Sequence, residues 1–124
     1  MQSGLRRLTS LALIVVACAV MASCQERSNS PVVTINILGS RGSNSYNPGD
    51  IVVNLGTLVT WVNQDSQPHS ATAPGAFDSG MIAPNGGKWT WTAAMQGTFS
   101  YSSLTDSSMT GKITVVAPPP QGGQ

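Results

Sequence analysis

The 124-residue sequence predicts an all-β domain, a Greek-key β-sandwich of about seven strands. Many short runs of β-branched and aromatic residues are separated by Gly, Pro, Asn and Asp, which is typical of a sandwich. No window shows the 3.6-residue period of an amphipathic helix. The roughly 100 residues that follow the first two dozen suffice for one domain with one hydrophobic core.

The first three expected strands lie in the first half of the chain. Residues 32–38 read VVTINIL, and DIVVNLG at 50–56 is followed at once by TLVTWVN at 57–63. Alternating apolar residues of this kind indicate strands with one buried face. Residues 40–50 form the most irregular stretch, and we expect Tyr46 within it to pack back on the sandwich.

The last three expected strands follow a strong turn signal. They are 87–95 (GKWTWTAAM), 97–102 (GTFSYS) and 111–116 (GKITVV). The dipeptide Asn85-Gly86 precedes the first of them and favours a tight turn, because both residue types tolerate positive φ.

Alternation within these strands also predicts the core. We expect Trp61 and Phe99 inside, together with the Val and Ile residues that share their faces. Of Trp89 and Trp91, we expect one inside and the other facing outward.

Residues 1–23 have the order of a secretory signal: a basic start, a short apolar run and small residues. The boundary VMASCQ resembles a bacterial lipobox, which implies that Cys24 is diacylated and anchors the protein to a membrane. Cys18, in VVAC, is a competing processing site. Gln25 resembles the residue that lets lipoproteins proceed to an outer membrane. We therefore expect an exported, lipid-anchored protein of the bacterial cell envelope, carried to the periplasmic side of the outer membrane where the host has one. The alternatives are ordinary cleavage nearby and an uncleaved anchor.

Composition divides the rest of the chain into three parts. Residues 24–30 are polar and end before a proline, which indicates a short tether. Residues 31–117 carry all the expected strands and form the domain. The Pro- and Gly-rich residues 118–124 have no apolar periodicity and are expected to be disordered.

Charge and cysteine content exclude several classes of protein. From residue 24 onward, four basic side chains stand against five acidic ones, so the net charge is four minus five, or about minus one. No basic residues cluster, which argues against nucleic acid as a partner. Both cysteines lie at or before residue 24, so the predicted domain has no thiol and no internal disulfide.

The order of motifs along the chain resembles one known family. The stretch GTLVTWVNQDSQPHSAT contains the only histidine, His69, just after an expected strand. It is followed by FDSGMIAPNGGKWTW, then by an aromatic strand, a polar loop and MTGKITV. This order resembles the cupredoxins, specifically their plastocyanin and amicyanin-like branch. The resemblance covers residues 31–116 and implies a sandwich of the cupredoxin type.

The resemblance also implies where a metal site would lie. Cupredoxins bind one copper ion through a histidine on the first loop and through Cys, His and Met on the last, and they transfer single electrons. His69 matches the first ligand and Met109 the axial one, while Ser103 stands where the Cys belongs and Asp106 where the second His belongs. A serine hydroxyl is hard and stays protonated, so it is a poor substitute for a thiolate.

We therefore favour a copper-free binding or structural module, without catalytic activity, that docks on an envelope protein complex. One alternative is a weak copper-binding or carrier protein that uses His69, Asp106 and Met109 with water; another is electron transfer of the family type. A third interpretation of the loop makes Asp106 a backbone-bonding residue and Met109 apolar cover.

A Ser/His/Asp arrangement for hydrolysis is also conceivable on this loop. It would combine His69 and Asp106 with one of the serines at 102, 103, 107 and 108. Catalysis would need a hydrogen-bonded nucleophile and base together with an oxyanion site, for which the sequence gives no signal.

Overall fold

The computed structural model describes residues 30–120 of the chain. The expected signal at 1–23, the processing sites Cys24 and Cys18, and most of the expected tether and tail lie outside these residues. The domain limits therefore stay predictions. Within the described range, no helix has the length and apolar character needed to cross a membrane.

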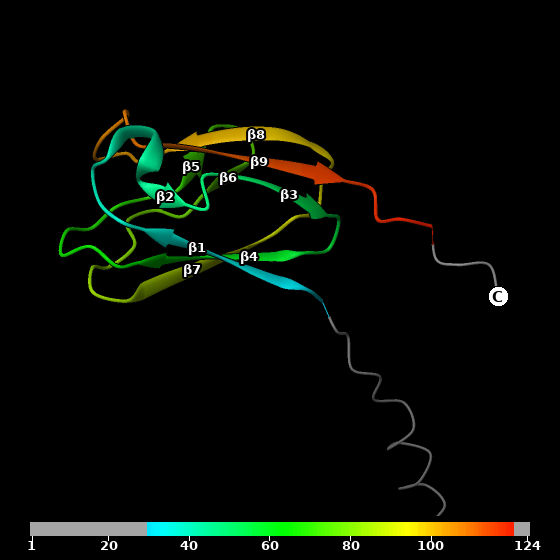
Figure 1. Ribbon diagram of the computed structural model, residues 1–124, viewed down its shortest axis with the longest axis horizontal. Helices are drawn as coiled ribbons and strands as arrows, with labels where there is room; N and C mark the ends of the chain where they lie inside the picture. The colour runs from blue at the N-terminus through cyan, green and yellow to red at the C-terminus, as the bar shows by residue number, and fades with distance from the viewer. Residues whose placement is uncertain (1–29, 121–124) are drawn as a thin grey trace, which may run out of the picture.

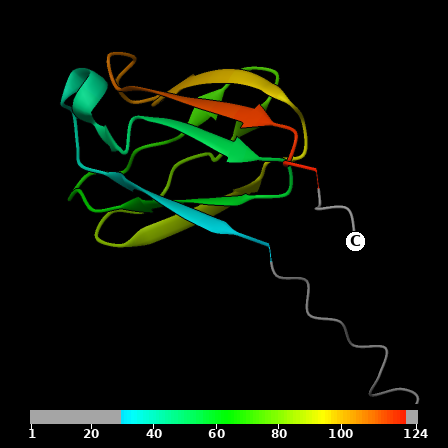
Figure 2. The same ribbon diagram turned by 45° about the vertical axis from the view of Figure 1, so that its right-hand side comes forward.

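The described residues form two mixed β-sheets that face each other as layers, which Figures 1 and 2 show from two directions. The strand order is β2-β1-β4-β7 in one sheet and β3-β9-β8-β5-β6 in the other. The strands are β1 (Val32–Ile37), β2 (Tyr46–Asn47), β3 (Asp50–Asn54), β4 (Leu58–Asn63), β5 (Thr72–Ala73), β6 (Phe77–Asp78), β7 (Gly87–Thr92), β8 (Gly97–Ser102) and β9 (Thr110–Val116). Apart from the short 3-10 turn η1 (Gly42–Asn44), residues 30–120 contain no helix.

This architecture confirms the predicted all-β sandwich, with nine strands in residues 30–120 rather than about seven. All six strands expected from alternation are present. The additional β2, β5 and β6 have two residues each. A pair of residues is too short to show alternation, which is why the sequence did not predict them.

The two long parallel pairings join segments that are far apart in the sequence. β1 runs parallel to β4, with Ile35 opposite Trp61, and β3 runs parallel to β9, with Ile51 opposite Ile113. These four residues point into the space between the sheets, where Ile35, Trp61 and Ile113 are fully buried. Register and burial therefore agree, as they must when one face of each sheet is covered.

Aromatic rings fill the middle of the sandwich. The Trp61 ring lies 5.4 Å from that of Tyr101, 5.3 Å from that of Phe77 and 5.5 Å from that of Trp89, measured between centroids. Trp91 also packs on Phe77, at 4.6 Å. Rings at these separations add to the stabilisation that their buried area provides.

The expectation that one of Trp89 and Trp91 faces outward was wrong. Both pack against the core and both are partly buried. The physical reason is the two-residue period of a strand, which puts residues two apart on the same face. Phe99 is also partly buried against the core, whereas Trp61 is fully buried as expected.

One end of the sandwich gathers the segments in which the candidate metal residues lie. The loop after β4, the turn η1 and the loop between β8 and β9 all meet there (Figure 1). Tyr46 packs back on the sandwich, as expected: it is buried, and its ring lies 4.7 Å from that of Tyr101. The fold thus brings His69 and residues 103–109 to the same end.

We predict that Gly111→Ala destabilises the domain. Gly111 lies opposite Tyr101 in the β8–β9 pair, and a methyl group there would overlap the Tyr101 ring and hydroxyl. Overpacking of a core typically costs about 1–3 kcal/mol. Chemical denaturation should therefore show a lower free energy of unfolding, while Ser100→Ala on the outward face of β8 should be nearly neutral. Equal stability of both variants would contradict the packing described.

Candidate metal centre

His69 is held rigidly at the start of the candidate site. Its backbone forms an isolated bridge to Ile82, with N–H···O distances of 3.4 and 2.7 Å. The side chain is buried, and both ring nitrogens are hydrogen-bonded. Nε2 lies 2.7 Å from the Asp65 carboxylate, and Nδ1 lies 3.1 Å from the Thr105 hydroxyl.

The loop before His69 is organised by the last residue of β4. The fully buried Asn63 donates its amide N–H groups to the carbonyls of Gln67 at 2.8 Å and Ile82 at 3.1 Å. Its side-chain oxygen accepts from the Asp65 N–H at 3.0 Å. Gly39 faces the Asp65 carboxylate so closely that a Cβ there would lie 3.1 Å from Oδ2. The Asp65 carboxylate is therefore directed onto the imidazole.

The pairing with Asp65 assigns the proton on His69. The hydrogen bond from His69 lowers the pKa of Asp65, so this carboxyl group is ionised at neutral pH and can only accept. Nε2 must then carry the proton that it donates. In the neutral ring, Nδ1 keeps its lone pair and accepts from the Thr105 hydroxyl.

Ser103 extends this network by one more hydroxyl group. The Ser103 side chain is buried, and its oxygen accepts from the Ser70 N–H at 3.1 Å and from the Thr105 N–H at 3.3 Å. Thr105 uses its only hydroxyl proton on His69, so Ser103 donates to the Thr105 oxygen, at 2.8 Å. The four side chains Ser103, Thr105, His69 and Asp65 thus form one directed chain of hydrogen bonds, which we name the Thr105 network.

The two remaining candidate residues have other partners. Met109 is fully buried, and its sulfur accepts from the Ser40 hydroxyl at 3.6 Å. The Asp106 carboxylate accepts from the Ser108 N–H at 3.0 Å and from the Ser108 hydroxyl at 2.6 Å. This hydroxyl is the main reason that the pKa of Asp106 is lowered. Both residues therefore have the local roles that we considered for them: backbone-bonding loop residue and apolar cover.

A second chain of hydrogen bonds fixes the 103–109 loop on the sheet below. The Leu104 N–H donates to the Ser70 hydroxyl at 2.8 Å, which lies 2.9 Å from Thr72, and Thr72 donates to Asp78 at 3.0 Å. The Tyr46 hydroxyl donates to the Ser70 carbonyl at 2.5 Å. Burial raises the pKa of Tyr46, which keeps this donor protonated. The loop is thus held from both sides.

The structure brings two of the four family positions into one network. His69 and Ser103 are linked through Thr105, whereas Asp106 and Met109 bond to neighbours outside the Thr105 network. Within residues 30–120, no three side chains among His, Cys, Asp and Glu are grouped so that they could hold a metal ion.

Sequence reasoning missed the two partners of the imidazole. Asp65 precedes His69 by four residues, and Thr105 lies 36 residues beyond it. Neither separation is a recognised motif.

The hydroxyls of Ser102, Ser107 and Ser108 form no hydrogen bond with His69 in the described part of the chain, so the Ser/His/Asp arrangement that we considered is not formed by those three serines.

Comparison with solved structures identifies the fold. A purple cupredoxin from Nitrosopumilus maritimus is 24% identical, with a TM-score of 0.61 over 68% of this chain and 99% of that chain. A reduced mutant of amicyanin is 21% identical, with a TM-score of 0.61 over 73% and 87% of the two chains. A Cu(I) form of another amicyanin mutant is 20% identical, with a TM-score of 0.59 over 68% and 82%.

These likenesses confirm the resemblance found in the sequence as far as the fold is concerned: the chain has a cupredoxin-like fold. No protein-family model matches the chain, and a search of curated proteins finds no match.

We predict that Asp65 contributes to stability above acidic pH. Because its pKa in the folded protein is lowered, its contribution is fully present above the usual Asp value of about 4 and is lost as the pH falls through the lower folded value. Melting temperatures between pH 7 and pH 2 should show Asp65→Asn less stable at neutral pH and converging with the wild type at the acidic end. Asp50→Asn, which removes only an exposed ion pair, is the matched control. A constant difference between Asp65→Asn and the wild type would contradict this assignment.

Proposed function

From its cupredoxin-like fold we infer that the chain is an exported, lipid-anchored envelope protein that uses this fold as a copper-free binding or structural module. The observation that carries the proposal is the Thr105 network. In this network the Thr105 hydroxyl donates a hydrogen bond to the Nδ1 atom of His69. Thr105 in turn accepts from Ser103, which stands at the position of the cysteine ligand in cupredoxins.

The residues present do not fit a type 1 copper centre. Such a centre needs a thiolate, two imidazoles and a weak axial thioether. Here Ser103 occupies the thiolate position, and its hydroxyl is hydrogen-bonded to Thr105. Asp106 occupies the position of the second imidazole, and its carboxylate is hydrogen-bonded to Ser108. Only His69 and Met109 have suitable donor atoms.

The proposed location rests on the sequence. Cys24 within the lipobox-like VMASCQ supports a lipid anchor, and the polar residues 24–30 would separate the domain from the membrane. An anchored domain with near-neutral charge fits a protein that binds a partner in the envelope.

The competing function is that of a copper carrier. It is favoured by one observation: the lone pair of Nδ1 points toward the loop that holds Met109, and Cu(I) accepts imidazole together with thioether. Such a site would require Thr105 to leave the imidazole. Each hydrogen bond lost in this way costs about 1 kcal/mol, which lowers the affinity.

We predict that copper changes the stability of the purified protein little. A ligand stabilises a fold only in so far as its concentration exceeds its dissociation constant. With Cu(II), or with Cu(I) under reducing conditions, the melting temperature should shift by less than about 2 °C at about 10 µM metal, and the protein should be colourless. Saturable binding of one copper per chain that is abolished in His69→Ala would overturn the proposal in favour of the carrier.

We predict that the missing ligands can be restored. The double variant Ser103→Cys with Asp106→His should gain absorption near 600 nm with copper, because it supplies the thiolate and the second imidazole. Adding Thr105→Ala to this double variant should raise copper affinity about fivefold, since the one remaining hydrogen bond of about 1 kcal/mol, from Thr105 to His69, no longer competes. Thr105→Ser keeps the hydroxyl and is the control. If none of these variants is coloured, the positions assigned to the ligands are wrong.

A further inference from the structure

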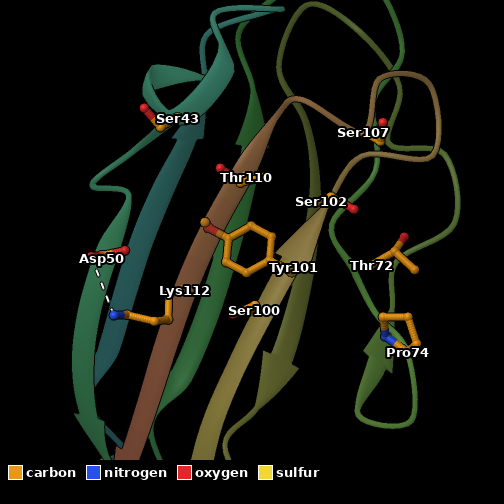
Figure 3. Close-up of a pocket in the computed structure, with 11 residues that line it drawn as sticks. Ser43, Asp50, Thr72, Pro74, Ser100, Tyr101, Ser102, Ser107, Thr110 and Lys112 are labelled. Carbon is orange, nitrogen blue, oxygen red and sulfur yellow. Dashed lines mark ion pairs between the residues drawn. The ribbon is translucent and has the colours of Figure 1, made fainter.

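A hollow of about 450 Å³ lies on the outer face of the five-stranded sheet, beside the candidate metal centre. Outward-facing residues of β3, β8 and β9 form its floor, among them Asp50, Ser100 and Lys112 (Figure 3). Ser43 of η1 and Ser107 of the 103–109 loop stand at its rim. Its volume is in the range of small-molecule sites.

A second hollow of about 460 Å³ adjoins the first and shares Ser43 and Asp50 with it. The second hollow continues past η1 to Asn44 and Asn47, whose side chains offer amide groups. Because they share Ser43 and Asp50, the two hollows are neighbours, and we refer to the two together as the trough. Two neighbouring hollows favour a ligand built of more than one unit.

Five of the eleven residues that line the first hollow have hydroxyl groups without protein partners in the described part of the chain, while the hydroxyl of Thr72, which also lines it, is paired with Ser70 and Asp78. The side chains of Ser100, Ser102 and Thr110 form no hydrogen bond to the protein within residues 30–120, and neither do those at its rim, Ser43 and Ser107. Elsewhere on the same sheet face, hydroxyls are paired, as between Thr98 and Thr114 at 3.4 Å. Hydroxyls that are free to donate and to accept therefore concentrate where the surface is concave.

The charges in this hollow cancel. Its only charged lining residues are Asp50 and Lys112, which form a long and exposed ion pair at 3.8 Å. A neutral lining disfavours phosphate or another anion, which basic residues would recognise. Two residues of the lining are apolar or aromatic: the Tyr101 ring is buried, and Pro74 is exposed but small, so a large apolar ligand is also disfavoured.

We propose that this trough binds a neutral oligosaccharide. Sugar hydroxyls both donate and accept, so they match the free serine and threonine hydroxyls. Asp50 can accept from a sugar hydroxyl and Lys112 can donate to one, which gives two charge-assisted hydrogen bonds. The floor is made of paired strands over a packed aromatic core, so the site is already formed without a ligand.

The inference rests on the proposed binding role and names the class of its ligand. Its experiment contains no metal, so a negative result here leaves the copper experiments unaffected. Conversely, a finding that the protein binds copper would contradict the proposed copper-free function, but it would leave open whether the trough binds sugar.

The test is a titration of the full-length protein with maltotriose, cellotriose and chitotriose, followed by amide NMR chemical shifts. We expect saturable shifts for at least one of them below about 20 mM, centred on β8 and β9, because polar sites without a stacking aromatic ring bind weakly. Ser102→Leu and Ser100→Leu each fill the hollow and should weaken binding at least tenfold. Thr98→Leu, on the same strand and face but outside the hollow, should bind as the wild type does.

Three results would overturn the inference. The first is the absence of saturable shifts with all three sugars. The second is equal binding by the two filling variants and by Thr98→Leu. The third is tighter binding of inorganic phosphate than of any sugar, which would make the hollow an anion site.

Discussion

A buried imidazole needs a hydrogen-bond partner on each nitrogen, and the end of the sandwich that holds His69 is arranged around this requirement. Asp65 meets it on one side and Thr105 on the other. An unpaired polar group in such a place costs several times the net gain from a satisfied one. Because the two partners come from different loops, satisfying the ring also fixes the loops relative to each other.

The same requirement links the two loops through side chains of the protein itself. In a blue-copper protein the ion links the first loop to the last. Here hydroxyl groups make that link, since Ser103 joins Thr105 to the backbone of Ser70. Hydroxyls suit this role because each can donate and accept at once, so several of them in sequence leave no buried atom of the network unpaired.

The six long strands were predictable because alternation over six or seven residues specifies both the element and its buried face. The resemblance located His69, Ser103, Asp106 and Met109. Thr105 and Asp65 could not be found in this way, because hydroxyls and carboxylates occur throughout polar loops. The trough depends on which outward residues of three strands become neighbours, and that is fixed by register rather than by local sequence.

The position of β9 has a consequence for how the chain becomes folded. This strand lies between the edge strand β3 and the central strand β8, and β3 precedes it by more than 50 residues in the sequence. Until β9 arrives, both neighbours have open edges, which invite pairing with other chains. While β9 has not joined the sheet, the two-sheet sandwich therefore stays open, so folding of the five-stranded sheet must wait for residues 110–116.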